Sequence, residues 1–109
     1  IVEYPNKNGG YATWINDLQL VAMKAPSGGK ILNTCMNIAE MLIQKNVSYG
    51  DSALSPINIF ASSTGTEQIA TRIDDKLNRI KNAQSFPGDN DIEDLIGYLI
   101  LYKISKDQS

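Results

Sequence analysis

The stretch TGTEQIATRIDDKLNRIKN, residues 64–82, carries the strongest helix pattern in the chain. Thr64 is followed three residues later by Glu67, the spacing at which a threonine hydroxyl and a glutamate side chain cap the first turn of a helix. Apolar side chains then recur at helical spacing, at Ile69, Ile73, Leu77 and Ile80. The stretch therefore predicts an amphipathic helix with one buried face.

Three more helices are predicted around it. The segment 11–25 is helix-friendly and ends before Pro26, and a longer helix is expected from about Lys30 to Asn46. Between them and the 64–82 stretch, residues 47–60 hold turn signals and Ser55-Pro56, so at most a short helical turn is expected at 57–60.

The last predicted helix starts at Asn90, which with Glu93 forms a second capping pattern, and runs to about Lys103. It is apolar nearly all round, through Ile92, Leu95, Ile96, Leu99, Ile100 and Leu101. A helix with so little polar surface is buried in a core or against a second subunit. The predicted fold is therefore all-α, a bundle of about four principal helices in one domain over 1–109, with 1–10 as a tail or turn and 30–104 as the helical core.

Composition excludes several classes of function. The chain has 109 residues with a formal net charge of −2, and its basic residues form no block, so nothing points directly to nucleic acid. Without histidine, zinc–histidine sites and histidine bases are excluded. A single cysteine excludes an internal disulfide and fits a reducing compartment. The absence of a long apolar run and of signal-peptide features at the start predicts a cytoplasmic protein with no membrane partner.

The acidic residues are the first candidates for chemistry. Asp75 has Arg72 and Arg79 at helical spacing, so a solvated ion-pair face accounts for it. Asp74 lacks such basic neighbours, and it shares a strip of oxygen-bearing side chains with Glu67 and with Asn78.

Hard oxygen ligands of this kind suit Mg²⁺, which often accompanies nucleotide phosphates. The residues expected around the metal are Glu40, Glu67, Asp74 and Asp94. Structural roles remain open beside this hypothesis: Glu67 can be a capping partner, and Asp91 and Asp94 can complement a helix dipole.

The segment KNVSYGDS, residues 45–52, is the second candidate, because its glycine permits a positive φ and its charges can meet a ligand. The alternative is an ordinary helix C-terminus, where Lys and Gly are both common. The residues predicted to contact a nucleotide or its phosphates are Lys45, Tyr49, Asp51, Arg72 and Lys76.

Three blocks carry a family resemblance: KNVSYGDSALSPINIF at 45–60, RIDDKLNRIKN at 72–82 and EDLIGYLILYKI at 93–104. Their order resembles short phage and prophage proteins of the group called nucleotide modification associated domain 1. More distantly it resembles the all-α, MazG-like nucleoside triphosphate pyrophosphohydrolases. The resemblance implies a helical, homo-oligomeric protein that binds nucleotides with Mg²⁺. Asp91 and Asp94 have the spacing of that family's second acidic motif, with Asp in place of Glu, whereas the first motif is absent.

Three functions follow from these observations. The first is a phage-type protein that binds a nucleotide with Mg²⁺, with its hydrolysis as a nucleoside triphosphate pyrophosphohydrolase left open and no catalytic residue assigned. The second is a protein that sequesters a nucleotide without turning it over. The third is a helical protein–protein interaction module, which the apolar last helix favours.

Overall fold

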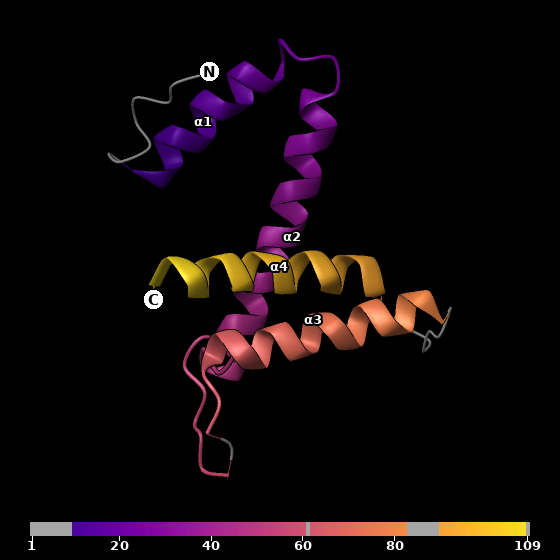
Figure 1. Ribbon diagram of the computed structural model, residues 1–109. Helices are drawn as coiled ribbons and strands as arrows, with labels where there is room; N and C mark the ends of the chain where they lie inside the picture. The colour runs from indigo at the N-terminus through magenta and orange to yellow at the C-terminus, as the bar shows by residue number, and fades with distance from the viewer. Residues whose placement is uncertain (1–9, 61, 83–89, 109) are drawn as a thin grey trace. The chain divides into compact units, whose positions relative to one another are not determined.

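The computed structural model describes residues 10–60, 62–82 and 90–108, and in these ranges the ordered elements are four α-helices without a strand (Figure 1). Their bounds are α1 Tyr11–Ala22, α2 Gly28–Tyr49, α3 Gly65–Lys81 and α4 Asp91–Gln108. The all-α prediction is confirmed. No helix among the described residues is long and apolar enough to cross a membrane.

The contacts within the chain divide it into two compact units, Ile1–Ala39 and Glu40–Ser109. The first unit holds α1 and the first part of α2, and the second holds the end of α2 with α3 and α4. Because α2 belongs to both units, one domain over 1–109 stays a prediction.

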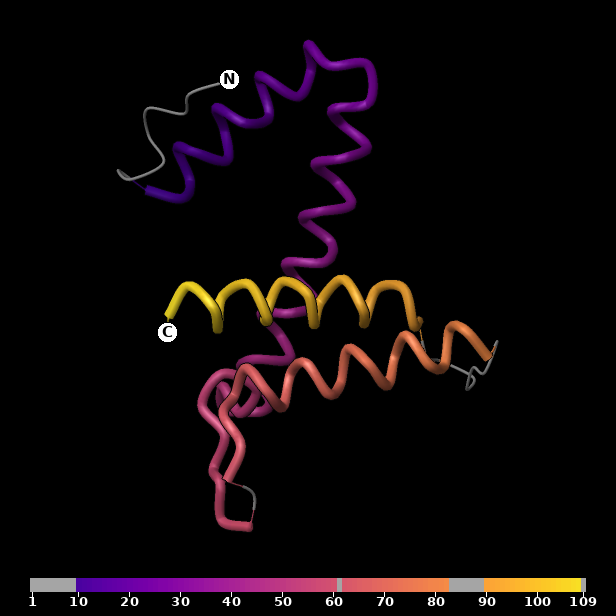
Figure 2. Tube along the Cα trace, in the orientation of Figure 1, coloured from indigo at the N-terminus to yellow at the C-terminus, as the bar shows by residue number. Residues whose placement is uncertain are grey.

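In the second unit α3 and α4 pack side by side and run in opposite directions (Figure 2). Ile69 on α3 is 1% exposed and is the most deeply buried large side chain described. Gly97 on α4 is buried against α2, where an added Cβ would lie 3.0 Å from Cδ2 of Leu42. The missing side chain thus lets α4 approach α2 closely.

Both predicted N-terminal caps form. The Thr64 hydroxyl accepts a hydrogen bond from the backbone N–H of Glu67 at 3.1 Å, and the Asn90 side chain accepts one from the N–H of Glu93 at 3.0 Å. Each bond satisfies an amide that the first helical turn leaves without a partner.

The predicted helix ends are less accurate. The first helix ends at Ala22, three residues early, whereas the second continues to Tyr49 and the last to Gln108. No helical turn forms at 57–60, where Asn58 has a φ of 53°. The Gln68 side-chain amide donates to Asn58 Oδ1 at 2.9 Å and so ties this loop to α3.

Arg79 does not take the ion-pair role expected for it. Its guanidinium lies 3.7 Å from Oδ1 of Asp91 on α4. Among the described residues no ion pair joins Asp75 to either arginine, and Asp75 is exposed. Arg79 is drawn across the interhelical contact because a partly buried carboxylate there binds a cation more strongly than an exposed one on its own helix does.

Candidate functional site

A pocket of about 400 Å³ opens in the second unit between the end of α2, the loop after it, α3 and α4. Its lining comprises Met41, Leu42, Lys45, Asn46, Tyr49, Asp51, Ser52, Ala53, Arg72, Asp94, Gly97, Tyr98 and Leu101. The volume lies within the range of small-molecule sites, and the wall combines apolar side chains with a few charges, as such sites usually do.

One face of α2 forms the first wall. Met41, Lys45 and Tyr49 are four residues apart and so lie above one another on the helix, with Leu42 and Asn46 beside them. Lys45 keeps half of its side chain exposed, at 51%. This wall therefore offers an aromatic ring and a cation from adjacent turns.

The turn that ends α2 forms the rim of the pocket. Gly50 and Asp51 have left-handed backbone angles, with φ of 60° and 62°. The Asp51 N–H donates to the carbonyl of Asn46 at 3.2 Å, the six-to-one bond that closes a helix with a left-handed C-terminal residue. The segment 45–52 therefore contains an ordinary helix C-terminus, and the same turn also forms part of the pocket wall.

The Asp51 carboxylate is held at this rim by neighbouring donors. The Asn46 amide donates to its Oδ1 at 2.7 Å, and the Ser55 hydroxyl lies 3.4 Å from Oδ2. These bonds fix its position and satisfy part of its acceptor capacity. Asp51 can accept from a ligand hydroxyl or amine at its remaining lone pairs.

The opposite wall comes from α4, through Asp94, Gly97, Tyr98 and Leu101. These positions follow the i, i+3, i+4, i+7 spacing of a single helix face. Tyr98 is half-buried there.

A network of charges joins this wall to α2 and α3. The Lys76 ammonium lies 3.0 Å from Oδ2 of Asp94 and 3.2 Å from Oδ1 of Asp91, and the Lys45 ammonium lies 3.5 Å from the other oxygen of Asp94. The side chains of Lys76, Asp91 and Asp94 are only 11%, 12% and 22% exposed. Screening by water is therefore weak, and the pairs are stronger than surface ion pairs.

Lys76 is stabilised in its charged form. Burial lowers its pKa, but hydrogen bonds to Asp94 and Asp91 raise it by more, so that the pKa lies above the ordinary value of 10.5. Lys76 consequently stays an ammonium throughout the neutral range and neutralises the carboxylates of α4.

Arg72 supplies the remaining cation of the pocket, from α3. Its side chain is exposed, and no ion pair or hydrogen bond of its guanidinium is found within the described residues. The lining thus carries two cations, Lys45 and Arg72, and two carboxylates, Asp51 and Asp94, so its formal charges balance.

The pocket brings together most of the residues predicted to contact a nucleotide. Lys45, Tyr49, Asp51 and Arg72 all line it, and Lys76 lies behind its wall at Asp94. Spacing within one helix could have indicated further lining residues, because Tyr98 and Leu101 share the α4 face of Asp94.

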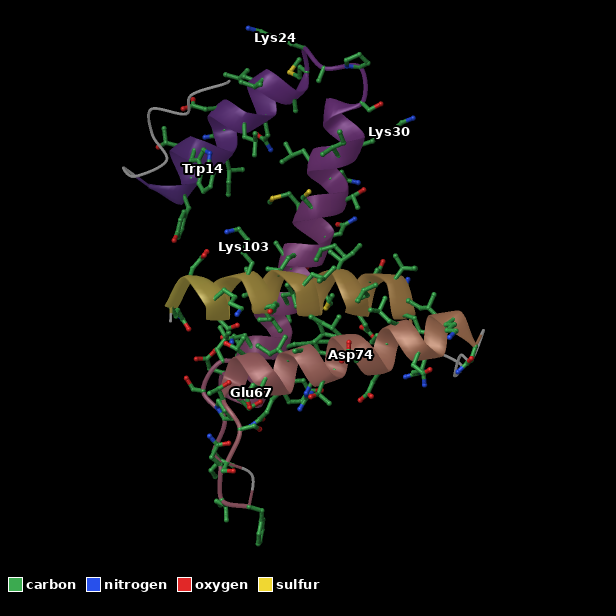
Figure 3. All side chains as sticks on the ribbon, in the orientation of Figure 1. Trp14, Lys24, Lys30, Glu67, Asp74 and Lys103 are labelled. Carbon is green, nitrogen blue, oxygen red and sulfur yellow. The ribbon has the colours of Figure 1, made fainter. Side chains whose placement is uncertain are left out.

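The residues predicted to hold Mg²⁺ do not converge. Asp94 lines the pocket, but Glu40, Glu67 and Asp74 do not. Figure 3 shows Glu67 near the start of α3 and Asp74 further along the same helix. Glu40 lies 3.4 Å from the Gln44 amide on its own helix. Within residues 10–60, 62–82 and 90–108, no group of three or more Asp, Glu, Cys or His side chains could hold a metal ion.

Comparisons of the chain with protein-family models, curated protein sequences and solved structures give no match. The MazG-like and phage-type resemblance stays a prediction, and the function proposed next rests on the pocket.

Proposed function

We propose that this chain is a nucleotide-binding protein whose ligand occupies the pocket between α2, α3 and α4. The observation that carries the proposal is the meeting of Arg72 and Lys45 with two tyrosines around one pocket of about 400 Å³. A nucleotide needs both kinds of surface, because it joins an anionic phosphate chain to a flat aromatic base.

The phosphate end is assigned to Arg72 and Lys45. A guanidinium can donate two parallel hydrogen bonds to phosphate oxygens, and an exposed Arg72 need not give up an ion pair to do so. Lys45 is only half-exposed and lies 3.5 Å from Asp94, a length at which its attraction is easily shared with a ligand.

The base end is assigned to the tyrosine side chains. Tyr98 is half-buried beside Leu101, and Tyr49 is exposed at the rim. Stacking on an aromatic ring contributes about 1–3 kcal/mol per base and tolerates any base. The Asp51 carboxylate, fixed by Asn46, is placed to accept hydrogen bonds from sugar hydroxyls or a base amine.

Binding without turnover fits the residues better than Mg²⁺-dependent hydrolysis. Of the four residues predicted to bind Mg²⁺, Asp94 lines the pocket, and the ammonium groups of Lys45 and Lys76 already neutralise its charge. A metal ion would have to displace a buried ammonium to use this carboxylate fully. We therefore place nucleotide sequestration, as a phage protein in the host cytoplasm could perform it, ahead of pyrophosphohydrolase activity.

A thermal-shift screen of ribo-, deoxyribo- and cyclic nucleotides, each with Mg²⁺ and with EDTA, tests the proposal. A ligand at 100 times its Kd stabilises a protein by about 2.7 kcal/mol, which raises the Tm of a domain of this size by several degrees. We expect a nucleotide that raises Tm in EDTA, more than its nucleoside or tripolyphosphate alone does. Pyrophosphate release in Mg²⁺ would favour the hydrolase, and no shift with any nucleotide at millimolar concentration would refute the proposal.

A further inference from the structure

The helix α4 has a mostly buried inner face, which meets the pocket and α3, and an exposed apolar outer face. Gly97 and Ser105 on the inner face are buried, and Asp94 and Leu101 beside them are half-buried. The outer face carries an exposed stripe, here called the α4 stripe, whose exposed fractions run from 37% to 58%. It consists of Ile92, Ile96, Leu99, Ile100 and Ile104.

An exposed row of branched aliphatic side chains along three turns of helix is unusual on the surface of a monomer. Contiguous apolar patches of this kind usually mark a site of association. Single exposed apolar residues need no such explanation, but here five lie on one face.

Four of the five residues of the α4 stripe form pairs placed symmetrically about Tyr98, whereas the mirror position of Leu99 is the buried Gly97. Ile92 and Ile104 lie six residues before and after Tyr98, and Ile96 and Ile100 lie two before and after it. Among the exposed charges, Glu93 and Lys103 lie five residues before and after the same point. Two of these pairs thus consist of two apolar residues, and the third consists of an acid and a base.

This symmetry has a geometric consequence for two antiparallel copies of α4. Because every residue rises 1.5 Å along the helix axis, a two-fold axis at the level of Tyr98 brings residues equally distant from Tyr98 to the same height. Ile92 would then lie level with Ile104 of the other copy, and Glu93 level with Lys103. A parallel pairing would instead set Glu93 beside Glu93 and Lys103 beside Lys103.

We propose that the α4 stripe is the dimer interface of this chain and binds a second copy in the antiparallel sense. One two-fold relation gives two Glu93–Lys103 pairs, one at each end of the apolar contact, so that charge complementarity selects a second copy as the occupant. Lys103 is 78% exposed and lies three and four residues after Ile100 and Leu99, so it shares the face of the stripe, and its ammonium lies 3.1 Å from Asp107 of its own helix.

Sedimentation equilibrium over a range of concentrations is the first test. We expect the full chain to change from monomer to dimer at about micromolar concentration, because a single helix pair forms a small interface. A chain that stays monomeric up to millimolar concentration would overturn the proposal and assign the α4 stripe to another occupant, such as residues 1–39 of the same chain.

Charge reversal then tests the antiparallel register. In a Glu93→Lys dimer two lysines meet at each end, and in a Lys103→Glu dimer two glutamates meet there. Each variant should dimerise about tenfold more weakly than the parent, because two attractive exposed pairs become repulsive. An equimolar mixture of the two variants should regain the parent's affinity as a heterodimer, since both ends are complementary again.

The control is Lys30→Glu, which changes the net charge as Lys103→Glu does but lies outside the second unit on an exposed part of α2. We expect this variant to dimerise like the parent, with helical circular dichroism confirming that all variants fold. Variants at 93 and 103 that dimerise normally, or a mixture that regains nothing, would overturn the antiparallel α4 interface. The test is independent of nucleotide binding.

Discussion

The Lys76 ammonium lies 3.0 Å from Oδ2 of Asp94, and this contact joins α3 to the pocket wall of α4. Lys76 is almost fully buried, and it also contacts Asp91 at 3.2 Å. One lysine thus compensates two carboxylates that would otherwise repel each other at the start of α4. The arrangement leaves Lys45, the more exposed partner of Asp94, available to a ligand.

We predict that Lys76→Met destabilises the fold by about 2–4 kcal/mol, because it leaves Asp91 and Asp94 buried without their main cation. The matched control is Lys81→Met on the same helix, at an exposed position, for which a change within about 0.5 kcal/mol is expected. Urea unfolding at pH 7, followed by circular dichroism, measures both. Equal stabilities of the two variants would show that the Lys76 network contributes little.

The same lysine predicts how stability depends on alkaline pH. The folded pKa of Lys76 lies above the ordinary 10.5 because its hydrogen bonds to Asp94 and Asp91 outweigh the lowering by burial. Its contribution is therefore complete below pH 10.5 and is lost as the pH rises through the folded pKa.

The difference in unfolding free energy between the parent and Lys76→Met should accordingly be constant from about pH 7 to 10 and should shrink above that range. Contributions of groups that are common to both proteins cancel in this difference. A difference that falls between pH 5 and 8 instead would assign the effect to a different group.

Two adjacent glycines offer a further test in the first unit. An added Cβ at Gly28 would collide with the backbone carbonyl of Ala22 at the end of α1, whereas an added Cβ at Gly29 would meet nothing within 4 Å. We expect Gly28→Ala to lower Tm by several degrees, because backbone on both sides must shift.

Gly29→Ala should keep or raise Tm, since alanine favours the helix by up to about 1 kcal/mol over glycine. Differential scanning calorimetry compares the two variants. A Gly28→Ala protein as stable as Gly29→Ala would mean that the turn between α1 and α2 relaxes without cost.

The sequence predicted the caps well because capping depends on residues three apart. Thr64 with Glu67, and Asn90 with Glu93, form the expected bonds. The end of α2 was harder to predict, since Asn46, Val47 and Ser48 have weak helix propensity and only the Gly50–Asp51 turn fixes where the helix stops.

The site was only partly predictable for a different reason. Four of the five residues predicted to contact a nucleotide line the pocket, namely Lys45, Tyr49, Asp51 and Arg72. Convergence of side chains from separate helices depends on packing, which spacing within one helix does not encode. Glu67 and Asp74, grouped on one face of α3, lie outside the pocket for that reason, and Arg79 contacts Asp91 instead of Asp75.

Isothermal titration of the parent, Arg72→Gln and Lys81→Gln, with the nucleotide that raises Tm most, tests the central claim most directly. Arg72→Gln removes the pocket's exposed guanidinium, whereas Lys81→Gln removes an equal charge from an exposed position on α3 that does not line the pocket. We predict that Arg72→Gln binds the nucleotide at least about tenfold more weakly, because it loses a charge-assisted hydrogen bond to phosphate. Binding by Lys81→Gln should be unchanged. Equal Kd values for all three proteins would contradict a nucleotide site in this pocket.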